Sequence, residues 1–149
     1  MRCVVQKVSE ASVTVNDEVV GSIGRGYMVL VGAEEGDTEA DVNYCVEKLV
    51  GLRVFEDEND KLNLSISDVG GSMLLVSQFT LLADARHGRR PSFIRAARPE
   101  VAEPLFERVV RGVADRGIPT QTGRFRTNMR VSLVNEGPCT ILLDSRKTF

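Results

Sequence analysis

Apolar residues alternate with polar ones over much of the chain, and this period of two constrains the fold more than any other feature. The alternation covers residues 4–15, and after a turn at Asn16-Asp17-Glu18 it covers residues 19–23. A third segment, Tyr27 to Ala33, follows the glycine-rich break at residues 24–26. Such segments are typical of half-buried strands, and the short turns between them predict hairpin-linked strands of one sheet.

Two segments have a helical period instead. Asp37 or Thr38 can cap a helix that ends at Gly51, and its apolar positions are Val42, Cys45, Val46 and Leu49. A second helix is predicted to start near Pro99, because proline is tolerated in the first helical turn, and to end at Gly117. Its apolar residues recur every four positions: Val101, Leu105, Val109 and Val113.

The remaining segments predict further strands. A short strand is expected at residues 53–55, and the strongly apolar run from Met73 to Leu82 is typical of a central strand. The end of the chain reads as a hairpin, with strands at residues 129–133 and 139–143 joined by a turn at residues 135–138.

Composition limits the class of protein. A chain of 149 residues with 42% apolar residues has the size of one domain, expected to span residues 1–149. The start of the chain has no targeting pattern, and no apolar run could span a bilayer, so we expect a cytoplasmic protein with no membrane partner. Three cysteines are too widely spaced for a zinc knuckle or a redox pair, and one histidine, His87, gives few metal donors. No metal and no cofactor are predicted.

The net charge of −2 conceals two halves of opposite sign. Residues 1–75 carry 6 basic and 14 acidic side chains, which gives −8, whereas residues 76–149 carry 13 and 7, which gives +6. The basic residues gather in two groups, one over residues 86–98 and one over residues 124–130. Such groups suit a phosphate backbone, although solvated surface arginines are an equally good interpretation of charge alone.

Two polar motifs interrupt otherwise apolar segments. Ser77-Gln78-Phe79-Thr80-Leu81 places two hydroxyls and an amide at the end of the predicted central strand. Hydroxyls in a strand often need only a cross-strand partner, and Thr80 as a nucleophile would require a base, which is not evident nearby. The second motif is Asn135-Glu136-Gly137-Pro138-Cys139-Thr140, a simple turn unless its glycine-proline bond is cis, which would align successive carbonyls as a rigid acceptor edge.

Together these motifs resemble the two signature segments of the D-aminoacyl-tRNA deacylases, the D-Tyr-tRNA deacylase family. The resemblance extends over essentially the whole chain, and five further segments carry it: residues 5–8, 11–15, 53–55, 90–93 and 122–125. It implies a compact mixed α/β fold with a largely antiparallel, barrel-like sheet and two flanking helices. It also implies a homodimer whose active site lies at the subunit interface.

The resemblance assigns roles residue by residue. The pocket around the scissile ester and the terminal adenosine would be lined by Ser77, Gln78, Phe79 and Thr80. The tRNA would be bound by Arg86, Arg89, Arg90, Phe125 and Met129. Gly137 and Pro138, joined by a cis bond, would come from the partner subunit and receive the substrate's amino group while excluding an L side chain.

The implied reaction is hydrolysis of the ester of D-aminoacyl-tRNA. Glycyl-tRNA is a second expected substrate, because glycine has no side chain to exclude. With no base evident for Thr80, we expect the neighbouring ribose hydroxyl to assist, while Thr80 and backbone amides position the ester and stabilise its oxyanion. Phe79 would pack or stack on the adenine.

Three positions depart from the family pattern. Cys139 stands where valine is usual, and Lys7 stands where an arginine often helps to fix the glycine-proline turn. A lysine cannot reproduce a forked guanidinium contact. Arg126-Thr127-Asn128 replaces a stretch that is usually smaller, which would alter the adenosine pocket or its rim.

Two other functions are compatible with parts of the sequence. A nucleic-acid binding protein without catalysis would use the basic second half, although the overall charge of −2 argues against it. A hydrolase of a different small ester would use Thr80 as a true nucleophile. Both explain fewer segments of the chain than the deacylase does.

Overall fold

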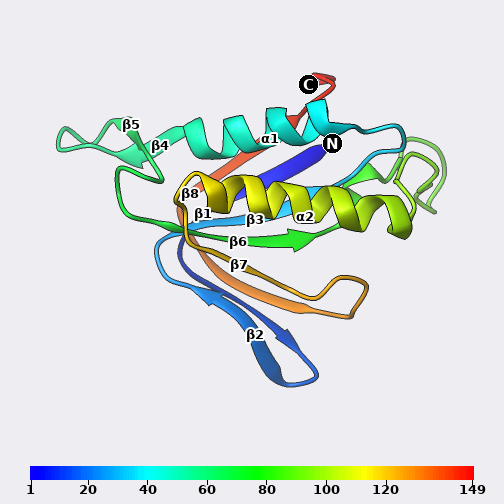
Figure 1. Ribbon diagram of the computed structural model, residues 1–149, viewed down its shortest axis with the longest axis horizontal. Coiled ribbons are helices and arrows are strands. Elements are labelled where there is room, and N and C mark those ends of the chain that lie inside the picture. The colour runs from blue at the N-terminus through cyan, green and yellow to red at the C-terminus, as the bar shows by residue number, and fades with distance from the viewer.

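A six-stranded sheet with two helices makes up most of the computed structural model, which describes all residues from Met1 to Phe149 (Figure 1). A separate two-stranded hairpin follows the first helix. In chain order the elements are β1 (Arg2–Val15), β2 (Glu18–Ile23), β3 (Gly26–Gly32), α1 (Glu39–Gly51), β4 (Arg53–Glu56), β5 (Leu62–Ser65), β6 (Ser72–Ser77), the 3-10 turn η1 (Phe79–Leu82), α2 (Pro99–Asp115), β7 (Thr120–Thr122) and β8 (Arg130–Asp144).

The sheet combines antiparallel and parallel pairs. Its order is β2-β1-β3-β6-β7, and β8 also pairs with β1. The pairs of β1 with β2, β3 and β8 are antiparallel, whereas β3–β6 and β6–β7 are parallel. The expected mixed α/β fold, with a largely antiparallel, barrel-like sheet and two helices, is confirmed. Neither helix has both the length and the apolar character required to cross a membrane.

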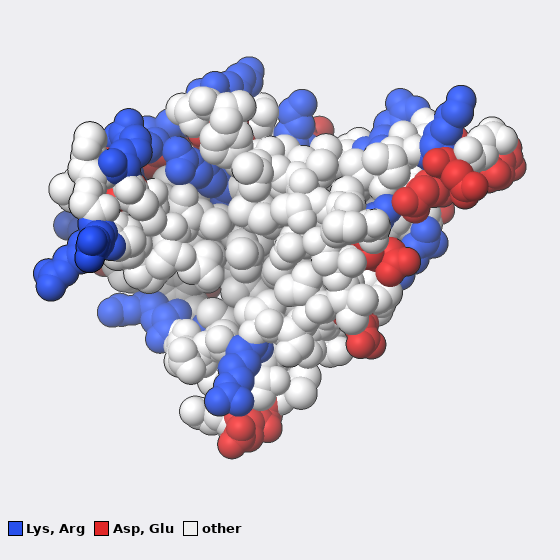
Figure 2. Space-filling view, turned by 180° about the vertical axis from the view of Figure 1, so that it is seen from behind, with Lys and Arg blue, Asp and Glu red and all other residues white.

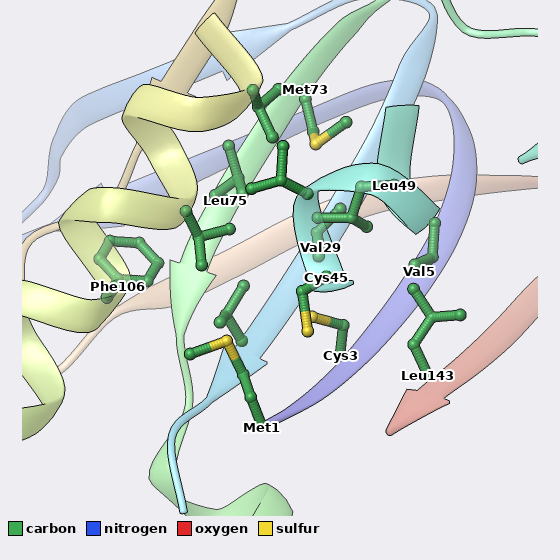
Figure 3. Packing of buried hydrophobic residues seen from close by; sticks show 14 of the residues in the cluster. Met1, Cys3, Val5, Val29, Cys45, Leu49, Met73, Leu75, Phe106 and Leu143 are labelled. Carbon is green, nitrogen blue, oxygen red and sulfur yellow. The ribbon is translucent and has the colours of Figure 1, made fainter. Parts of the chain in front are cut away.

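Strand β6 separates two hydrophobic cores. Met73 and Leu75 face the larger core, which lies under the two helices and is drawn in Figure 3, whereas Leu74 and Val76 face a smaller core inside the curled part of the sheet. Because both faces of the strand are covered, its sequence is continuously apolar rather than alternating. The prediction of a central strand here is therefore correct for residues 72–77.

The predicted C-terminal end of this strand is wrong. The strand stops at Ser77, and Phe79–Leu82 forms η1 instead of continuing to Leu82 as a strand. The last ladder bond is donated by the Gln78 N–H to the Val31 carbonyl, at 2.8 Å. Leu82 is fully buried at the end of the turn, so the apolar run belongs to two elements and its length alone could not show where the strand ends.

The predicted C-terminal hairpin is also wrong. Residues 130–135 and 140–144 do not pair with each other, because both pair with β1 as parts of one long strand, β8. Gln6 pairs with Thr140 and Val8 with Asn135, so residues 136–139 lie opposite Lys7 alone. We call residues 136–139 the β8 bulge. A bulge of this kind leaves its extra residues unpaired and available for other contacts.

The side chain of Asn135 closes the β8 bulge. Its Oδ1 accepts a hydrogen bond from the Cys139 N–H at 3.0 Å, and its Nδ2 donates one to Thr140 Oγ1 at 3.1 Å. These two bonds replace ladder bonds that the bulge interrupts, and they hold its two ends together.

The cysteines are closer in space than in sequence. Cys3 in β1 and Cys45 in α1 are fully buried neighbours in the larger core, and Figure 3 shows their sulfur atoms side by side. The hydrogen bond with Cys45 and burial raise the pKa of Cys3 well above its usual value. Both thiols therefore act as small buried hydrophobes, as expected, although their sequence spacing had excluded a pair. Cys139 is half-buried.

A buried ionic cluster ties the end of β3 to the segment that precedes α2. Arg146 contacts Glu34 at 2.7 Å and Asp37 at 3.0 Å, and Arg95 contacts Glu34 at 3.1 Å. The Asp37 carboxylate also contacts the Met1 ammonium at 2.9 Å and has no exposed surface. Because each carboxylate has more than one cationic partner, the cluster compensates the cost of burying its charges.

Asp37→Asn tests how much this cluster contributes to the stability of the fold. The substitution keeps the size of the side chain but leaves the buried Met1 ammonium without its counter-ion, so we expect the free energy of unfolding to fall by about 3 kcal/mol. Urea unfolding measures it. Asp115→Asn, at the exposed end of α2, is the control and should change stability by less than about 0.5 kcal/mol. Equal stability of the two variants would show that the cluster is dispensable.

Asn135→Ala tests the closure of the β8 bulge. Losing both hydrogen bonds should reduce the free energy of unfolding by about 1–2 kcal/mol. Asn135→Asp is the matched variant, because it retains an acceptor for the Cys139 N–H and loses the donor to Thr140, so it should cost about half as much. A Cys139 amide that exchanges with solvent no faster in Asn135→Ala than in the unmodified protein would contradict this account.

Candidate functional site

The end of β6 turns sharply because β3 leaves room for it. Gly32, the last residue of β3, packs directly under η1: a Cβ atom at this position would lie 2.7 Å from Leu82 Cδ2 and 2.8 Å from the Gln78 carbonyl oxygen. Any side chain at residue 32 would push η1 away from the sheet. The close approach of two backbones therefore sets the position of residues 77–82.

The four residues predicted for the catalytic pocket lie together at this turn. Ser77 and Gln78 are half-buried, whereas Phe79 and Thr80 are exposed on η1. The first hydrogen bond of the turn is donated by the Leu81 N–H to the Gln78 carbonyl, so the turn itself supplies no acceptor for the N–H groups of Phe79 and Thr80. These donors lie at the position where the sequence predicts an oxyanion site.

Thr80 has an amide for a neighbour and not a base. The Gln78 side-chain amide donates a hydrogen bond to Thr80 Oγ1. An amide nitrogen cannot remove a proton from a hydroxyl, so this contact orients Thr80 without activating it as a nucleophile.

A cavity of about 740 Å³ opens beside η1. Its aromatic and sulfur-containing walls come from η1, from the segment before α2 and from the segment before β8: Phe79, Phe93, Phe125 and Met129. Phe79 and Phe93 meet edge to face with ring centroids 5.3 Å apart. The structure thus brings Ser77, Gln78 and Phe79 together with Phe125 and Met129, as the sequence predicts. Thr80 is not part of this lining.

The size and lining of this cavity suit a flat aromatic ligand. Cavities of roughly 300–1,000 Å³ with apolar walls and a few polar groups are typical of small-molecule sites. Polar groups at this cavity include Arg98, Arg126 and Asn128. Sequence analysis missed Arg98 and Phe93 as site residues, although Phe93 lies in the segment Arg90 to Phe93 that carries the family resemblance.

Basic and acidic groups are unevenly distributed over the molecule, although both kinds occur at each end. In Figure 2 the lysine and arginine side chains gather at the end that carries the segment after β6, while acidic side chains crowd the β4–β5 hairpin. Arg89 and Arg90 are exposed and have no carboxylate within 4.0 Å. Arg86 differs, because Asp84 lies 2.7 Å from its guanidinium. That contact holds the pKa of Asp84 well below its usual range.

Gly137 and Pro138 are exposed in the β8 bulge, and their peptide bond is cis. The bulge lies opposite Lys7 at one end of a row of paired residues that crosses the sheet. In this row Lys7 pairs with Tyr27, and Tyr27 pairs with Met73 at the start of β6. From Met73 to Ser77 the strand advances by about 13 Å at roughly 3.3 Å per residue. The bulge is therefore remote from η1 of its own chain.

The structure also locates the residues that depart from the family pattern. Arg126, Thr127 and Asn128 all line the cavity. The Lys7 ammonium is only 3% exposed and contacts the Val54 carbonyl at 3.1 Å and Glu56 Oε1 at 2.8 Å. Lys7 thus anchors β4 beneath the β8 bulge rather than contacting its carbonyl groups.

Comparison with known proteins identifies the family of the chain. The family model described as D-Tyr-tRNA(Tyr) deacylase matches residues 4–144. A D-aminoacyl-tRNA deacylase of Symbiobacterium thermophilum is 59% identical over 149 residues, covering 100% of this chain and 99% of the relative. The corresponding protein of Clostridioides difficile is 52% identical, with 100% of both chains covered.

Solved structures agree with the fold. One described as c-Myc DNA unwinding element binding protein has a TM-score of 0.92 and 39% identity, covering 97% of this chain and 98% of its own. Another, described as a probable eukaryotic D-amino acid tRNA deacylase, has a TM-score of 0.82 at 20% identity, covers 95% of this chain and 97% of its own, and supports the fold alone. The prediction of a hydrolase of this family is confirmed, and the chain belongs to the D-Tyr-tRNA(Tyr) deacylase family.

Proposed function

We propose that this protein hydrolyses the ester bond of D-aminoacyl-tRNA and of glycyl-tRNA, and that two subunits build each active site. The observation that carries the proposal is the cavity in which the residues of the Ser77–Phe79 motif meet Phe125 and Met129. Family membership gives the reaction class, and the cavity gives a place for the terminal adenosine beside the polar turn.

The adenosine fits the cavity through its base. Unpaired bases stack on aromatic side chains, and Phe79, Phe93 and Phe125 all line the space. An adenine held there leaves the ribose directed toward η1. The scissile ester on that ribose then lies next to the N–H groups of Phe79 and Thr80, which stabilise the negative charge that develops on the carbonyl oxygen.

The ribose itself assists hydrolysis. The only hydrogen-bond partner of Thr80 Oγ1 is the amide of Gln78, so this hydroxyl lacks the adjacent base that a nucleophilic threonine requires. The hydroxyl next to the aminoacylated oxygen of the ribose takes the role of directing water to the ester. The protein contributes position and charge stabilisation rather than a shifted pKa.

Chirality is read by the partner subunit. Gly137 and Pro138 lie remote from η1 of their own chain but are exposed, so they are available to the pocket of a second copy. Their carbonyl groups receive the amino group of the substrate, and the backbone leaves no space on that side for an L side chain. Selection is by exclusion, which is why glycine also passes.

The exposed arginines bind the rest of the tRNA. Arg89 and Arg90 have no acidic partner and can contact phosphates of the acceptor stem. Arg86 contributes less, because Asp84 already neutralises its charge. Residues 126–128 line the cavity and would contact the bound adenosine.

Nucleic-acid binding without catalysis is the second candidate. The solved structure with the TM-score of 0.92 is described as a DNA unwinding element binding protein, and the basic end of this molecule is compatible with such a role. A purified protein that binds nucleic acid but releases no amino acid from charged tRNA would favour this function over ester hydrolysis.

Release of D-tyrosine, L-tyrosine and glycine from charged tRNA tests the proposal. We expect the D ester to be cleaved at least roughly 100-fold faster than the L ester, equal to about 2.8 kcal/mol of discrimination, and glycine to be released as well. Equal rates for the two tyrosyl esters would contradict the proposed chiral filter. Tyrosyl-tRNA incubated without protein provides the background rate.

Thr80→Ala separates the two mechanisms. If Thr80 only positions the substrate, the variant should keep substantial activity, with a loss of about tenfold or less in the rate of D-tyrosine release. If Thr80 were the nucleophile, the variant would lose all activity. His87→Ala, which removes the single histidine, should leave the rate unchanged. Circular dichroism confirms that both variants are folded, and complete inactivity of a folded Thr80→Ala protein would contradict substrate assistance.

A further inference from the structure

One buried hydroxyl in the molecule has no explained partner. Tyr27 is fully buried in β3, and its hydroxyl forms no hydrogen bond. Buried polar groups are almost always hydrogen-bonded, because water is lost when they are buried and nothing replaces it. A tyrosine hydroxyl left without a partner can donate to an acceptor that lies close to it.

The β8 bulge is the part of the chain that can supply this contact. Tyr27 pairs with Lys7 on one side of β1, while residues 136–139 pass Lys7 on its other side. Residues paired across a sheet direct their side chains to the same face, so Tyr27 and Lys7 point to one side beneath the bulge. Burial, and to a smaller extent the Cys139 thiol, raise the pKa of Tyr27 well above its usual value, which keeps the hydroxyl a proton donor.

The tyrosine ring is packed on both sides, whereas the tip of the β8 bulge is exposed. The ring of Tyr27 stacks on Phe55 with centroids 5.2 Å apart and planes at 26°. Phe55 in turn contacts the cationic groups of Lys7 at 5.7 Å and Arg25 at 5.2 Å. By contrast, Glu136, Gly137 and Pro138 are exposed. A packed donor therefore lies beneath a segment whose outer face is open to a second subunit.

We propose that Tyr27 is a positioning residue for the β8 bulge, and that its hydroxyl donates a hydrogen bond to Cys139 Sγ when the bulge is seated in the pocket of a second subunit. This role rests on the cross-subunit filter of the proposed function. Asn135 fixes the bulge through the Cys139 backbone, and Tyr27 fixes it through the Cys139 side chain. Residue 139 adjoins the filter directly, so its position sets that of Gly137 and Pro138.

Alkylation of Cys139 tests the contact independently of catalysis. Cys3 and Cys45 are buried whereas Cys139 is half-buried, so Cys139 is the thiol that iodoacetamide should reach first. Tyr27→Phe retains the ring and its stacking on Phe55 but removes the hydroxyl. Because a hydrogen bond donated to sulfur stabilises the reactive thiolate, we expect Cys139 to react about fivefold more slowly in this variant, the effect of losing one ordinary hydrogen bond. Tyr44→Phe, the same change on α1, is the matched control and should react as the unmodified protein does.

Chiral discrimination tests the function of the contact. Tyr27→Phe should lower the ratio of D-tyrosine to L-tyrosine release by about fivefold with little change in the rate for the D ester. A purely structural tyrosine would alter the unfolding temperature but not this ratio. Cys139→Val should give the same reduction, and the double variant should lose no more than either single one, because both remove the same bond.

The outcomes separate this inference from the function on which it rests. Unchanged alkylation and an unchanged D/L ratio in Tyr27→Phe overturn the role of Tyr27 while the deacylase proposal stands. An unmodified protein that does not distinguish D from L overturns the filter, and the alkylation rates still decide whether Tyr27 contacts the bulge. Additive effects in the Tyr27→Phe, Cys139→Val double variant show two separate contacts and overturn the assignment of Cys139 as the acceptor.

Discussion

Pairing along β1 is the interaction on which the rest of the structure depends. This single strand pairs with β2, β3 and β8, and it contributes to both cores. Cys3 and Val5 face the helices, whereas Ala11 and Val13 face the inside of the curled sheet, although all four have odd numbers. The register shift between Val8 and Glu10 makes this possible, because one extra residue reverses the face to which an alternating pattern points. Without that shift, one of the two cores would lose the apolar side chains that β1 contributes to it.

The position of the site is set by where the two hydrophobic cores end along β6. Both faces of β6 are covered up to Val76, and the strand must leave the sheet where the covering stops. Gly32 lets the departing chain stay close to β3, and Glu34 holds the returning segment through Arg95. The cavity forms between these two fixed points. Packing of the core and placement of the polar turn are therefore parts of one arrangement, and the site is rigid without a catalytic charge pair.

Local patterns predicted the elements that depend on local physics. Both helices were predicted close to their observed ends, because caps, proline and a four-residue apolar spacing act within one element. The end of β6 and the supposed C-terminal hairpin were wrong, since each depends on a partner far along the chain: Val31 for Gln78, and β1 for both halves of β8. The same holds for the cavity, whose walls at Phe79, Phe93 and Phe125 come from three separate segments. The short strands β5 and β7 were not predicted, because four or three residues carry too little periodicity.

The separation of charge along the molecule has a consequence for the kinetics of encounter. The exposed arginines on the segment after β6 and the acidic side chains on the β4–β5 hairpin distribute the charge unevenly over the molecule, despite a net charge of only −2. A polyanion approaching it feels a torque before any contact, and the basic end turns toward the polyanion while the acidic end turns away. Collisions are thereby orientated, and the fraction that is productive rises. Raised ionic strength shortens the reach of that field to about 3 Å at 1 M salt, so capture slows while the chemistry inside the cavity keeps its rate.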